Sequence, residues 1–314
     1  MPTAMSSTAI DSTDSGLTSD VVIGIPAYNE AETVGDVVRS ALDPDVDVLV
    51  VDDGSDDRTA TVAAEAGATV VSHSENRGYG AALGTLFETA HEHDIDHLVV
   101  VDADGQHDPT EAEDLVATQR QSDGDIVIGS RLVPGSQTEM PLYRRGGLAV
   151  INGLIALALR LGYSSKRVAD SQSGFRAYNA DAIELLACQA DLSDGMDASI
   201  DILFHAAEAD YTFVETPVDV TYDVAEANTH NPVVHGLVLV RNVFSRVLTD
   251  RPVRSLGVPG SVCLLLGGLL SRASLSGYTL LSAVVPLLIT LLVIAGGGLV
   301  GAALAFNRLS PRRD

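Results

Sequence analysis

The stretch Leu98–His107 (LVVVDADGQH) joins a run of four apolar residues to two aspartates that stand one residue apart. Such a run is typical of a buried strand, and side chains alternate along a strand, so Asp102 and Asp104 are expected to point to one side of its end. In open α/β sheets, ligands bind just beyond the carboxyl ends of the strands. The stretch therefore predicts either a solvated acidic turn or a site where a divalent cation, Mg²⁺ or Mn²⁺, bridges to a nucleotide diphosphate.

Strand-like and helix-like segments alternate on both sides of this stretch. Short apolar runs predict the strands, and the longer segments between them have a helical pattern. This repetition predicts an α/β fold with a mostly parallel sheet that is flanked by helices on both faces. The predicted strands are 21–25, 46–51, 69–72, 98–101 and 126–128, and the helices between them include 30–42, 59–66 and 79–92.

The charge of the chain limits its partners. The 314 residues carry 43 acidic and 19 basic side chains, a net charge of −24. A surface of this sign repels nucleic acid, so none is expected as a partner, and it has no general attraction for anionic lipid. The excess of carboxylates is typical of proteins that work in concentrated salt, as in a halophile, where screening weakens their repulsion. The two cysteines, Cys188 and Cys263, predict neither a disulfide framework nor a zinc site.

Basic residues are concentrated in one segment. Between Arg120 and Arg176 the chain has eight basic and four acidic residues, and elsewhere it has eleven basic and thirty-nine acidic ones. The planar fork of arginine suits phosphate, so an acidic protein with its arginines gathered in this way is expected to bind an anion there. The alternative is a set of scattered surface ion pairs.

The two ends of the chain differ from its middle. Residues 1–19 are rich in Ser, Thr and Asp and predict a disordered tail. Segment 232–250 mixes apolar residues with His and Arg, which predicts either an interfacial juxtamembrane helix or a packed core helix. Residues 255–271 and 273–307 contain no charge.

These uncharged segments predict two transmembrane helices within 255–307, joined around Arg272 as a hairpin, because a helix rises 1.5 Å per residue and the hydrocarbon core is about 30 Å thick. A soluble pair of apolar helices is the alternative. Arginines before the first segment and in the basic tail 308–314 place both termini and the catalytic domain in the cytoplasm, by the positive-inside rule.

Six short motifs follow one another along the region 20–231. An aromatic residue, acidic residues and small residues at strand ends are what a nucleoside pocket needs, although each motif alone is an ordinary turn or helix cap. In chain order the motifs are Pro26–Glu30 (PAYNE), Val51–Asp57 (VDDGSDD), Asn76–Gly78 (NRG), Asp102–His107 (DADGQH), Gly129–Arg131 (GSR) and Asp170–Arg176 (DSQSGFR).

With these motifs in this order, residues 20–235 resemble the inverting family-2 glycosyltransferases of GT-A fold, and specifically the dolichyl-phosphate mannose and glucose synthase branch. The resemblance implies a Rossmann-like catalytic domain over 20–231, carried by the membrane hairpin. It implies a hexosyltransferase that moves one sugar from UDP-glucose or GDP-mannose to a polyprenyl (dolichyl) phosphate, giving a lipid-linked sugar for glycosylation. Membrane lipid is then a partner, and the oligomeric state is left open.

The same resemblance implies roles for individual residues. The residues implied to be catalytic are Asp102, Asp104 and Arg131. The divalent cation would be held by Asp102, Asp104 and Gln106. The nucleotide sugar would be bound by Pro26, Tyr28, Glu30, Val51, Asp53, Arg77, Asp102, Ala103 and Asp104. The acceptor phosphate would be bound by Arg131, Arg144, Arg145, Asp170 and Arg176, although Asp170 is equally well explained as a helix or turn cap.

The chain departs from the family pattern in one place. Relatives usually carry a basic loop of the form Arg-x-x-Gly-x-Ser-Lys after the strand that is expected to end at Tyr222. Here segment 223–232 has acids and His230 instead. This leaves the identity of the donor open, and His230 or an arginine from elsewhere would have to replace the missing contact.

Two other functions remain as alternatives. A transferase that elongates a lipid-linked or cell-surface glycan could use the same donor site. A polysaccharide synthase is disfavoured, because the Gln-x-x-Arg-Trp motif of those enzymes requires a tryptophan and this chain has none. A non-catalytic, membrane-tethered α/β scaffold with Asp52 and Asp53 as an acidic pair would not explain the later motifs.

Overall fold

The structure is a computed structural model that describes residues 17–43, 45–138, 140–163, 168–190, 192–195, 197–221, 256–275 and 284–309. Most of the predicted N-terminal tail, the predicted helix 232–250, the departing loop 223–232 and most of the basic tail lie outside these residues. The chain forms two compact units, which we call the sheet unit (1–139, 173–202 and 213–222) and the helical unit (140–172, 203–212 and 223–314).

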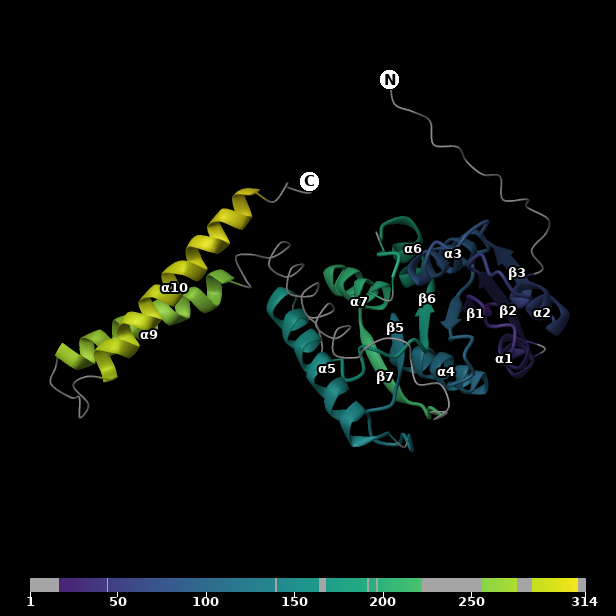
Figure 1. Ribbon diagram of the computed structural model, residues 1–314, viewed down its shortest axis with the longest axis horizontal. Coiled ribbons are helices and arrows are strands. Elements are labelled where there is room, and N and C mark those ends of the chain that lie inside the picture. Colours follow the sequence, from purple (N-terminus) through teal and green to yellow (C-terminus); the bar gives the residue numbers. More distant parts are fainter. Residues whose placement is uncertain are drawn as a thin grey trace, which may run out of the picture. The chain divides into compact units, whose positions relative to one another are not determined.

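A seven-stranded sheet runs through the described part of the sheet unit, in the order β3-β2-β1-β4-β6-β5-β7 (Figure 1). β6 pairs antiparallel with β4 and β5, and all other pairs are parallel. The prediction of a mostly parallel sheet is confirmed. The strands are β1 (Val21–Ala27), β2 (Val46–Asp52), β3 (Thr69–Ser72), β4 (His97–Val100), β5 (Ile126–Ser130), β6 (Arg176–Asn179) and β7 (Phe213–Pro217).

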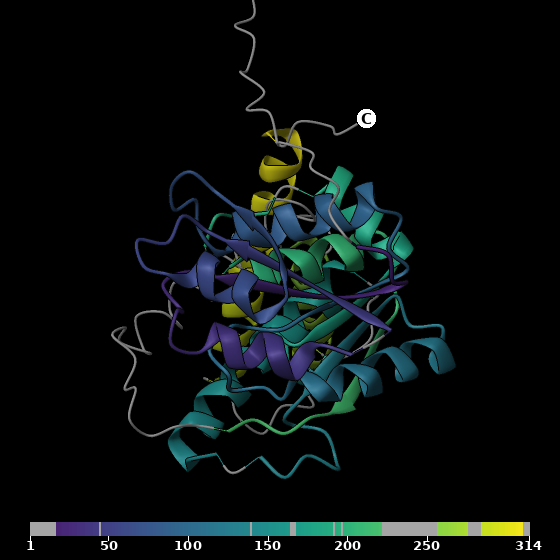
Figure 2. The same cartoon turned by 90° about the vertical axis from the view of Figure 1, so that its right-hand side faces the viewer.

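Helices cover both faces of the sheet (Figure 2). One face packs against α1 (Val34–Ala41), α2 (Thr59–Ala66) and α4 (Ala112–Ser122), the last preceded by the short helix η1 (Pro109–Glu111). The opposite face packs against α3 (Tyr79–Glu92) and α6 (Ala180–Cys188), while α7 (Ala198–Glu208) precedes β7. The first helix begins at Val34, later than predicted, because the backbone N–H of Glu30 donates to Thr59 at the start of α2 and that of Ala31 donates to Asp57 in the loop before it.

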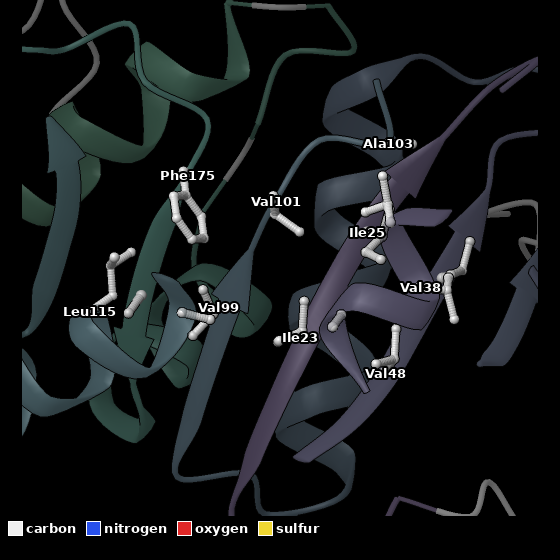
Figure 3. Close-up of a cluster of buried hydrophobic side chains, with 14 of the residues drawn as sticks. Ile23, Ile25, Val38, Val48, Val99, Val101, Ala103, Leu115 and Phe175 are labelled. Atoms are coloured by element: carbon white, nitrogen blue, oxygen red, sulfur yellow. The ribbon is translucent and has the colours of Figure 1, made fainter. Parts of the chain in front are cut away.

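The core on the α1 and α4 face is mostly aliphatic, with Phe175 as its aromatic member (Figure 3). Ile23, Val48 and Val99 from three neighbouring strands meet Val38 and Leu115 from the helices above them. Burial of such side chains stabilises the fold by about 1.5–3 kcal/mol each relative to exposure. The core extends to the end of β4, so the loop that carries the two aspartates starts from a rigid base.

The helical unit contains α5 (Leu142–Gly162) and the C-terminal helices α9 (Val258–Leu275) and α10 (Val284–Leu309). α9 and α10 run antiparallel, because Gly260 lies against Gly296 and Leu299 while Gly267 lies against Val293. A Cβ on Gly260 would stand 2.9 Å from the carbonyl oxygen of Gly296, so glycine permits this close approach.

One of these helices satisfies the length and composition of a membrane span. Segment Leu288–Ala305 of α10 has a mean hydropathy of 2.3 and is only 11% buried, whereas the apolar part of α9, Gly260–Arg272, is shorter than a span requires. In the part of the chain that the structure describes, the prediction of two spanning helices is thus supported for α10, and the hairpin is only weakly supported.

Candidate active site

The loop Asp102–His107 leaves the carboxyl end of β4, between β1 and β6. The N–H of Val101 still donates to the carbonyl of Gly24 in β1, and Ala103 turns its side chain into the aliphatic core (Figure 3). Gly105 adopts a left-handed φ of 70°, which glycine reaches without strain. The core side chain before the turn and the glycine within it fix the path of the loop.

The carboxylates of this loop differ in exposure. Asp102 is partly buried, whereas Asp104 and Gln106 are exposed. Oδ1 of Asp104 accepts a hydrogen bond of 2.9 Å from the backbone N–H of Gln106, which orders the turn. The partly buried carboxylate of Asp102 is thus followed by two exposed side chains that carry oxygen atoms, Asp104 and Gln106.

Asp102 lies in an electrostatic environment that disfavours its charge. Burial is the main cause that raises its pKa to about 6, and the negative charges of Asp104 and Glu30 raise it further. A hydrogen bond from Tyr79 and the charge of Arg176 act in the opposite direction. Burial also holds the pKa of Tyr79 well above its ordinary value, so the phenol is the donor. Predicted donor-site residues from the ends of β1 and β4 therefore come close enough to repel one another.

These residues fit a divalent cation that is shared with a ligand. Mutual repulsion between Asp102 and Asp104 is what a bound cation relieves, and carboxylate and amide oxygens are suitable ligands for Mg²⁺ or Mn²⁺. Among the described residues, however, no group of three His, Cys, Asp or Glu side chains is arranged to hold a metal. Magnesium is commonly held by one or two carboxylates together with substrate phosphates, and this donor set suits that mode of binding.

The loops after β1 and β2 brace each other. Asn29 has a left-handed conformation with φ 56°, and its backbone N–H donates a hydrogen bond of 2.8 Å to Oγ of Ser55. Its side-chain oxygen accepts from the N–H of Asp56 at 3.0 Å, and the N–H of Glu30 donates to Thr59 at 2.8 Å. Tyr28 stands beside these contacts with 43% of its surface exposed. An exposed ring on a braced loop is suited to stacking on a nucleotide base.

Asp53 uses its carboxylate inside the protein. Its two oxygens accept the backbone N–H groups of Arg77 (2.9 Å) and Gly78 (2.7 Å), and Oδ1 lies 2.6 Å from Nδ1 of His73. The other ring nitrogen of His73 lies 2.9 Å from Oγ1 of Thr85. Asp53 therefore fixes the loop 76–78, while the side chain of Arg77 is exposed.

The neighbouring Asp52 has the opposite character. It ends β2, is 5% exposed, and in the described residues no hydrogen bond reaches its buried Oδ1. A buried acceptor without a donor is costly unless a ligand supplies one. The sequence singled out Asp53 for the nucleotide, and the structure leaves a free acceptor on Asp52.

Three predicted donor-site residues lie in the sheet and its core. Pro26 faces Val51 in the register of β1 and β2, and Val51 is completely buried. Ala103 is 3% exposed. Because these side chains fill the interior, only their backbone groups are placed to meet a ligand.

The predicted acceptor arginines are distributed over both units. Arg131 follows β5 directly in the sheet unit and is partly exposed. In the helical unit, Arg145 is exposed near the start of α5 and Asp170 is completely buried. Arg144 belongs to the same helix, but its side chain lies outside the described part of the structure.

Arg176 lies in the interior of the sheet unit with 1% of its surface exposed. Its Nε donates to the carbonyl of Ser173 (2.8 Å) and its Nη1 to the carbonyl of Ser199 (2.9 Å). It also bonds to the hydroxyl of Tyr178, which counters the effect of burial on the pKa of that phenol. The sequence predicts that this arginine binds an acceptor phosphate, whereas in the structure its Nε and Nη1 groups donate to backbone carbonyls in the interior.

Sequence reasoning did not identify Tyr79 or His73 as parts of this site. Tyr79 directly follows the motif Asn76–Gly78, and its hydroxyl donates to Oδ1 of Asp102 over 3.1 Å. The position after a motif was the signal that could have indicated it. His73 follows the predicted strand 69–72, and no local pattern distinguishes it from the other histidines.

Comparisons with known proteins identify the family of this chain. The family model described as "Glycosyl transferase family 2" matches residues 22–185, more than half of the chain. The undecaprenyl-phosphate mannosyltransferase of Micrococcus luteus is 35% identical over 202 residues, 62% of this chain and 80% of that protein. The polyprenol monophosphomannose synthase of Mycolicibacterium smegmatis is 32% identical over 215 residues, 65% of this chain and 78% of that protein.

A solved structure shares the fold. Glucosyl-3-phosphoglycerate synthase from Mycobacterium tuberculosis, in complex with Mn²⁺, UDP-glucose and phosphoglyceric acid, superposes with a TM-score of 0.52 and 23% identity, covering 73% of this chain and 79% of that one. The sheet is thus of the GT-A type. With a family model that covers more than half of its length, this chain belongs to glycosyl transferase family 2.

Proposed function

We propose that this protein transfers one hexose from a nucleotide sugar to a polyprenyl phosphate, with inversion at the sugar, in the presence of Mg²⁺ or Mn²⁺. The observation that carries the proposal is the repulsive group of Asp102, Asp104 and Glu30 at the ends of β4 and β1. Carboxylates placed so that they disfavour each other's charge, at the ligand-binding edge of an α/β sheet, are typical of a functional site.

The donor side follows from this group. Asp102, Asp104 and Gln106 would hold the cation, which supplies positive charge to the departing diphosphate. Tyr28 would stack on the base, and the free oxygen of Asp52 would accept an N–H from the base edge. The solved neighbour was obtained with Mn²⁺ and UDP-glucose, which supports this type of donor.

Further donor contacts come from groups that surround this pocket. Glu30 would accept from a sugar or ribose hydroxyl, and the exposed Arg77 would meet a phosphate. Pro26, Val51 and Ala103 would contribute backbone groups only, since their side chains are buried. Asp53 would act by holding the loop that carries Arg77.

The acceptor side needs alignment more than base catalysis. An oxygen of the lipid phosphate attacks the anomeric carbon, the bond from that carbon to the diphosphate breaks, and the nucleoside diphosphate leaves with the electron pair. The phosphate is already ionised near neutral pH, so no strong general base is required. Arg131 would hold it against its repulsion by the diphosphate. A contribution from Arg144, Arg145 and Asp170 stays a prediction from the sequence.

The membrane part of the proposal rests on α10. Its apolar segment Leu288–Ala305 is long enough to anchor the protein, and α9 packs against it. The arginines around these helices favour the cytoplasm for the catalytic domain. Two relatives whose names specify undecaprenyl phosphate and polyprenol support a lipid acceptor.

A transfer assay on membranes that contain the full chain tests the proposal. Membranes are incubated with labelled UDP-glucose or GDP-mannose, MnCl₂, and dolichyl or undecaprenyl phosphate, and the label in the lipid extract is counted. We expect label from one donor, dependent on added lipid phosphate and lost with EDTA. If neither donor labels lipid phosphate while a sugar acceptor is elongated, the protein is a glycan-extending transferase instead.

A further inference from the structure

The carboxylate of Asp102 is enclosed by residues from two other segments of the sheet unit, Tyr79 and Gly174. The hydroxyl of Tyr79, the first residue of α3, donates to Oδ1 over 3.1 Å. On the other side, a Cβ built on Gly174 would stand 2.5 Å from Oδ2, so any larger residue there would collide with the carboxylate. The φ of Gly174 is not left-handed, so space rather than backbone conformation requires glycine at this position.

Tyr79 is itself held firmly. The residue before it, Gly78, donates its N–H to Asp53, and the residue after it, Gly80, donates to the carbonyl of Asp194 over 3.0 Å. Gly80 packs directly on the backbone of Ser193, so the start of α3 cannot shift toward that segment. The phenol that reaches Asp102 therefore comes from a backbone fixed on both sides.

Arg176 supplies positive charge from behind the carboxylate. The register of β4 and β6 pairs Arg176 with Val100, two residues before Asp102, and the charge of Arg176 favours the ionised carboxylate. Its bonds to the carbonyls of Ser173 and Ser199 keep the guanidinium in the interior. The same carboxylate is repelled by Asp104 of its own motif and by Glu30 of the motif Pro26–Glu30.

We propose that Tyr79, Gly174 and Arg176 are positioning residues that hold the Asp102 carboxylate in the orientation from which it binds the metal–nucleotide complex. Without them, repulsion by Asp104 and Glu30 would turn the carboxylate away, and it would have to be reordered when the ligand binds. Arg176 then acts on the donor side, from the interior, and not on the acceptor phosphate. This inference rests on the proposed function, because it assumes that the site binds a metal–nucleotide complex.

Calorimetric titration of the purified full chain tests the inference. UDP and GDP are each titrated with MnCl₂ and with EDTA, and the nucleotide that binds the wild-type protein with Mn²⁺ is used for the variants. Tyr79→Phe removes only the hydroxyl, and Gly174→Ala pushes on the opposite oxygen, so the two variants disturb one carboxylate independently. The matched controls are Tyr211→Phe, at a partly exposed tyrosine before β7, and Gly84→Ala, where nothing lies within 4 Å of the added Cβ.

We expect Tyr79→Phe and Gly174→Ala each to weaken binding of the Mn²⁺–nucleotide complex about tenfold, which corresponds to about 1.4 kcal/mol. Binding with EDTA, and the melting temperature of the ligand-free protein, should change little, as should nucleotide binding in the two controls. Because Gly84 lies inside α3, Gly84→Ala should raise the melting temperature slightly without affecting binding. A purely structural role would weaken both kinds of binding together.

Two results would overturn the inference. One is wild-type affinity for the Mn²⁺–nucleotide complex in Tyr79→Phe, whose conservative change leaves the fold intact even if Gly174→Ala does not fold. The other is an equal loss of binding with Mn²⁺ and with EDTA. If the wild-type protein binds neither nucleotide with Mn²⁺, the proposed function itself is wrong, and the inference is rejected with it.

Discussion

Two acidic pairs stand at the carboxyl edge of the same sheet, and the protein treats them differently. In the pair after β2, Asp53 is compensated by two backbone N–H groups and His73. In the pair after β4, Asp102 accepts a hydrogen bond from Tyr79 but faces the charges of Asp104 and Glu30. A carboxylate that accepts hydrogen bonds from the protein on both oxygens stabilises the fold. A carboxylate that lies among other negative charges is suited to binding an external cation.

The comparison also holds within each pair. Asp52 keeps a buried oxygen that no described residue reaches, although it adjoins the fully engaged Asp53. Asp104 is exposed, although it adjoins the enclosed Asp102. In the first pair an anchored carboxylate adjoins one whose buried oxygen has no partner among the described residues, and in the second pair an enclosed carboxylate is followed by an exposed one, so substitutions can separate their roles.

The largest expected effect is on Asp104. Asp104→Ala should lower sugar transfer by about a thousandfold, because Asp104 is exposed and is the proposed ligand of a cation that would neutralise the charge of the leaving diphosphate. The circular dichroism spectrum should not change. Transfer is measured in the lipid-extraction assay, with Asp108→Ala as the matched control, since Asp108 only caps η1 through Thr110. Activity near that of the parent would remove Asp104 from the metal site.

The second effect separates Asp53 from Asp52. Asp53→Asn should lower the free energy of unfolding by about 3 kcal/mol, because one amide oxygen cannot replace a carboxylate that serves two N–H groups and His73 in a buried site. Asp52→Asn should leave the melting temperature almost unchanged and weaken nucleotide binding. Thermal denaturation and calorimetry on the same two samples check both statements, and the reverse pattern would exchange their roles.

The contribution of Asp102 to the free energy of unfolding should differ between acidic and neutral pH. Its pKa of about 6 in the folded protein lies above the ordinary value of 3.8, so the folded state binds this proton more tightly than the unfolded state. The resulting stabilisation is complete below about pH 4 and is lost as the pH rises through 6. Relative to the wild type, Asp102→Asn should therefore be more stable at pH 8 than at pH 4.5, by about 2 kcal/mol.

Denaturation in EDTA at the two pH values measures this difference. Asp108→Asn, the same change at an exposed aspartate, serves as the control. Equal stability differences at pH 4.5 and pH 8 would show that Asp102 carries no excess charge, and the contrast with Asp53 would disappear.

The sequence predicted the framework of the sheet more completely than the environment of its polar groups. Five strands and the position of the Asp102–His107 loop follow from apolar runs, because burial on both faces of a parallel sheet leaves a continuous hydrophobic signature. β6 (RAYN) has no such run, because two of its four residues, Arg176 and Asn179, are polar.

The roles of Arg176 and Asp53 depend on contacts between distant segments. Arg176 bonds to Ser199, and Asp53 meets His73 and Gly78. An arginine in an acidic chain is a reasonable candidate for a phosphate ligand, but local pattern cannot show that its donors are used by carbonyls elsewhere. The sequence shows which residues can bind an anion. Which groups they actually bond to depends on segments that only the fold brings together.

The smallest expected effect concerns Thr85, which contacts Asp53 indirectly through His73. Thr85 contacts the far nitrogen of His73 over 2.9 Å, so Thr85→Val should lower the free energy of unfolding by about 1 kcal/mol while leaving sugar transfer unchanged. Thr89→Val on the same helix is the control, because the described contacts of Thr89 run through its backbone carbonyl. Thermal denaturation and the transfer assay are compared for the two variants. A loss of transfer in Thr85→Val without a loss of stability would mean that the Asp53 group serves the donor directly, and the two acidic pairs would then differ in degree rather than in kind.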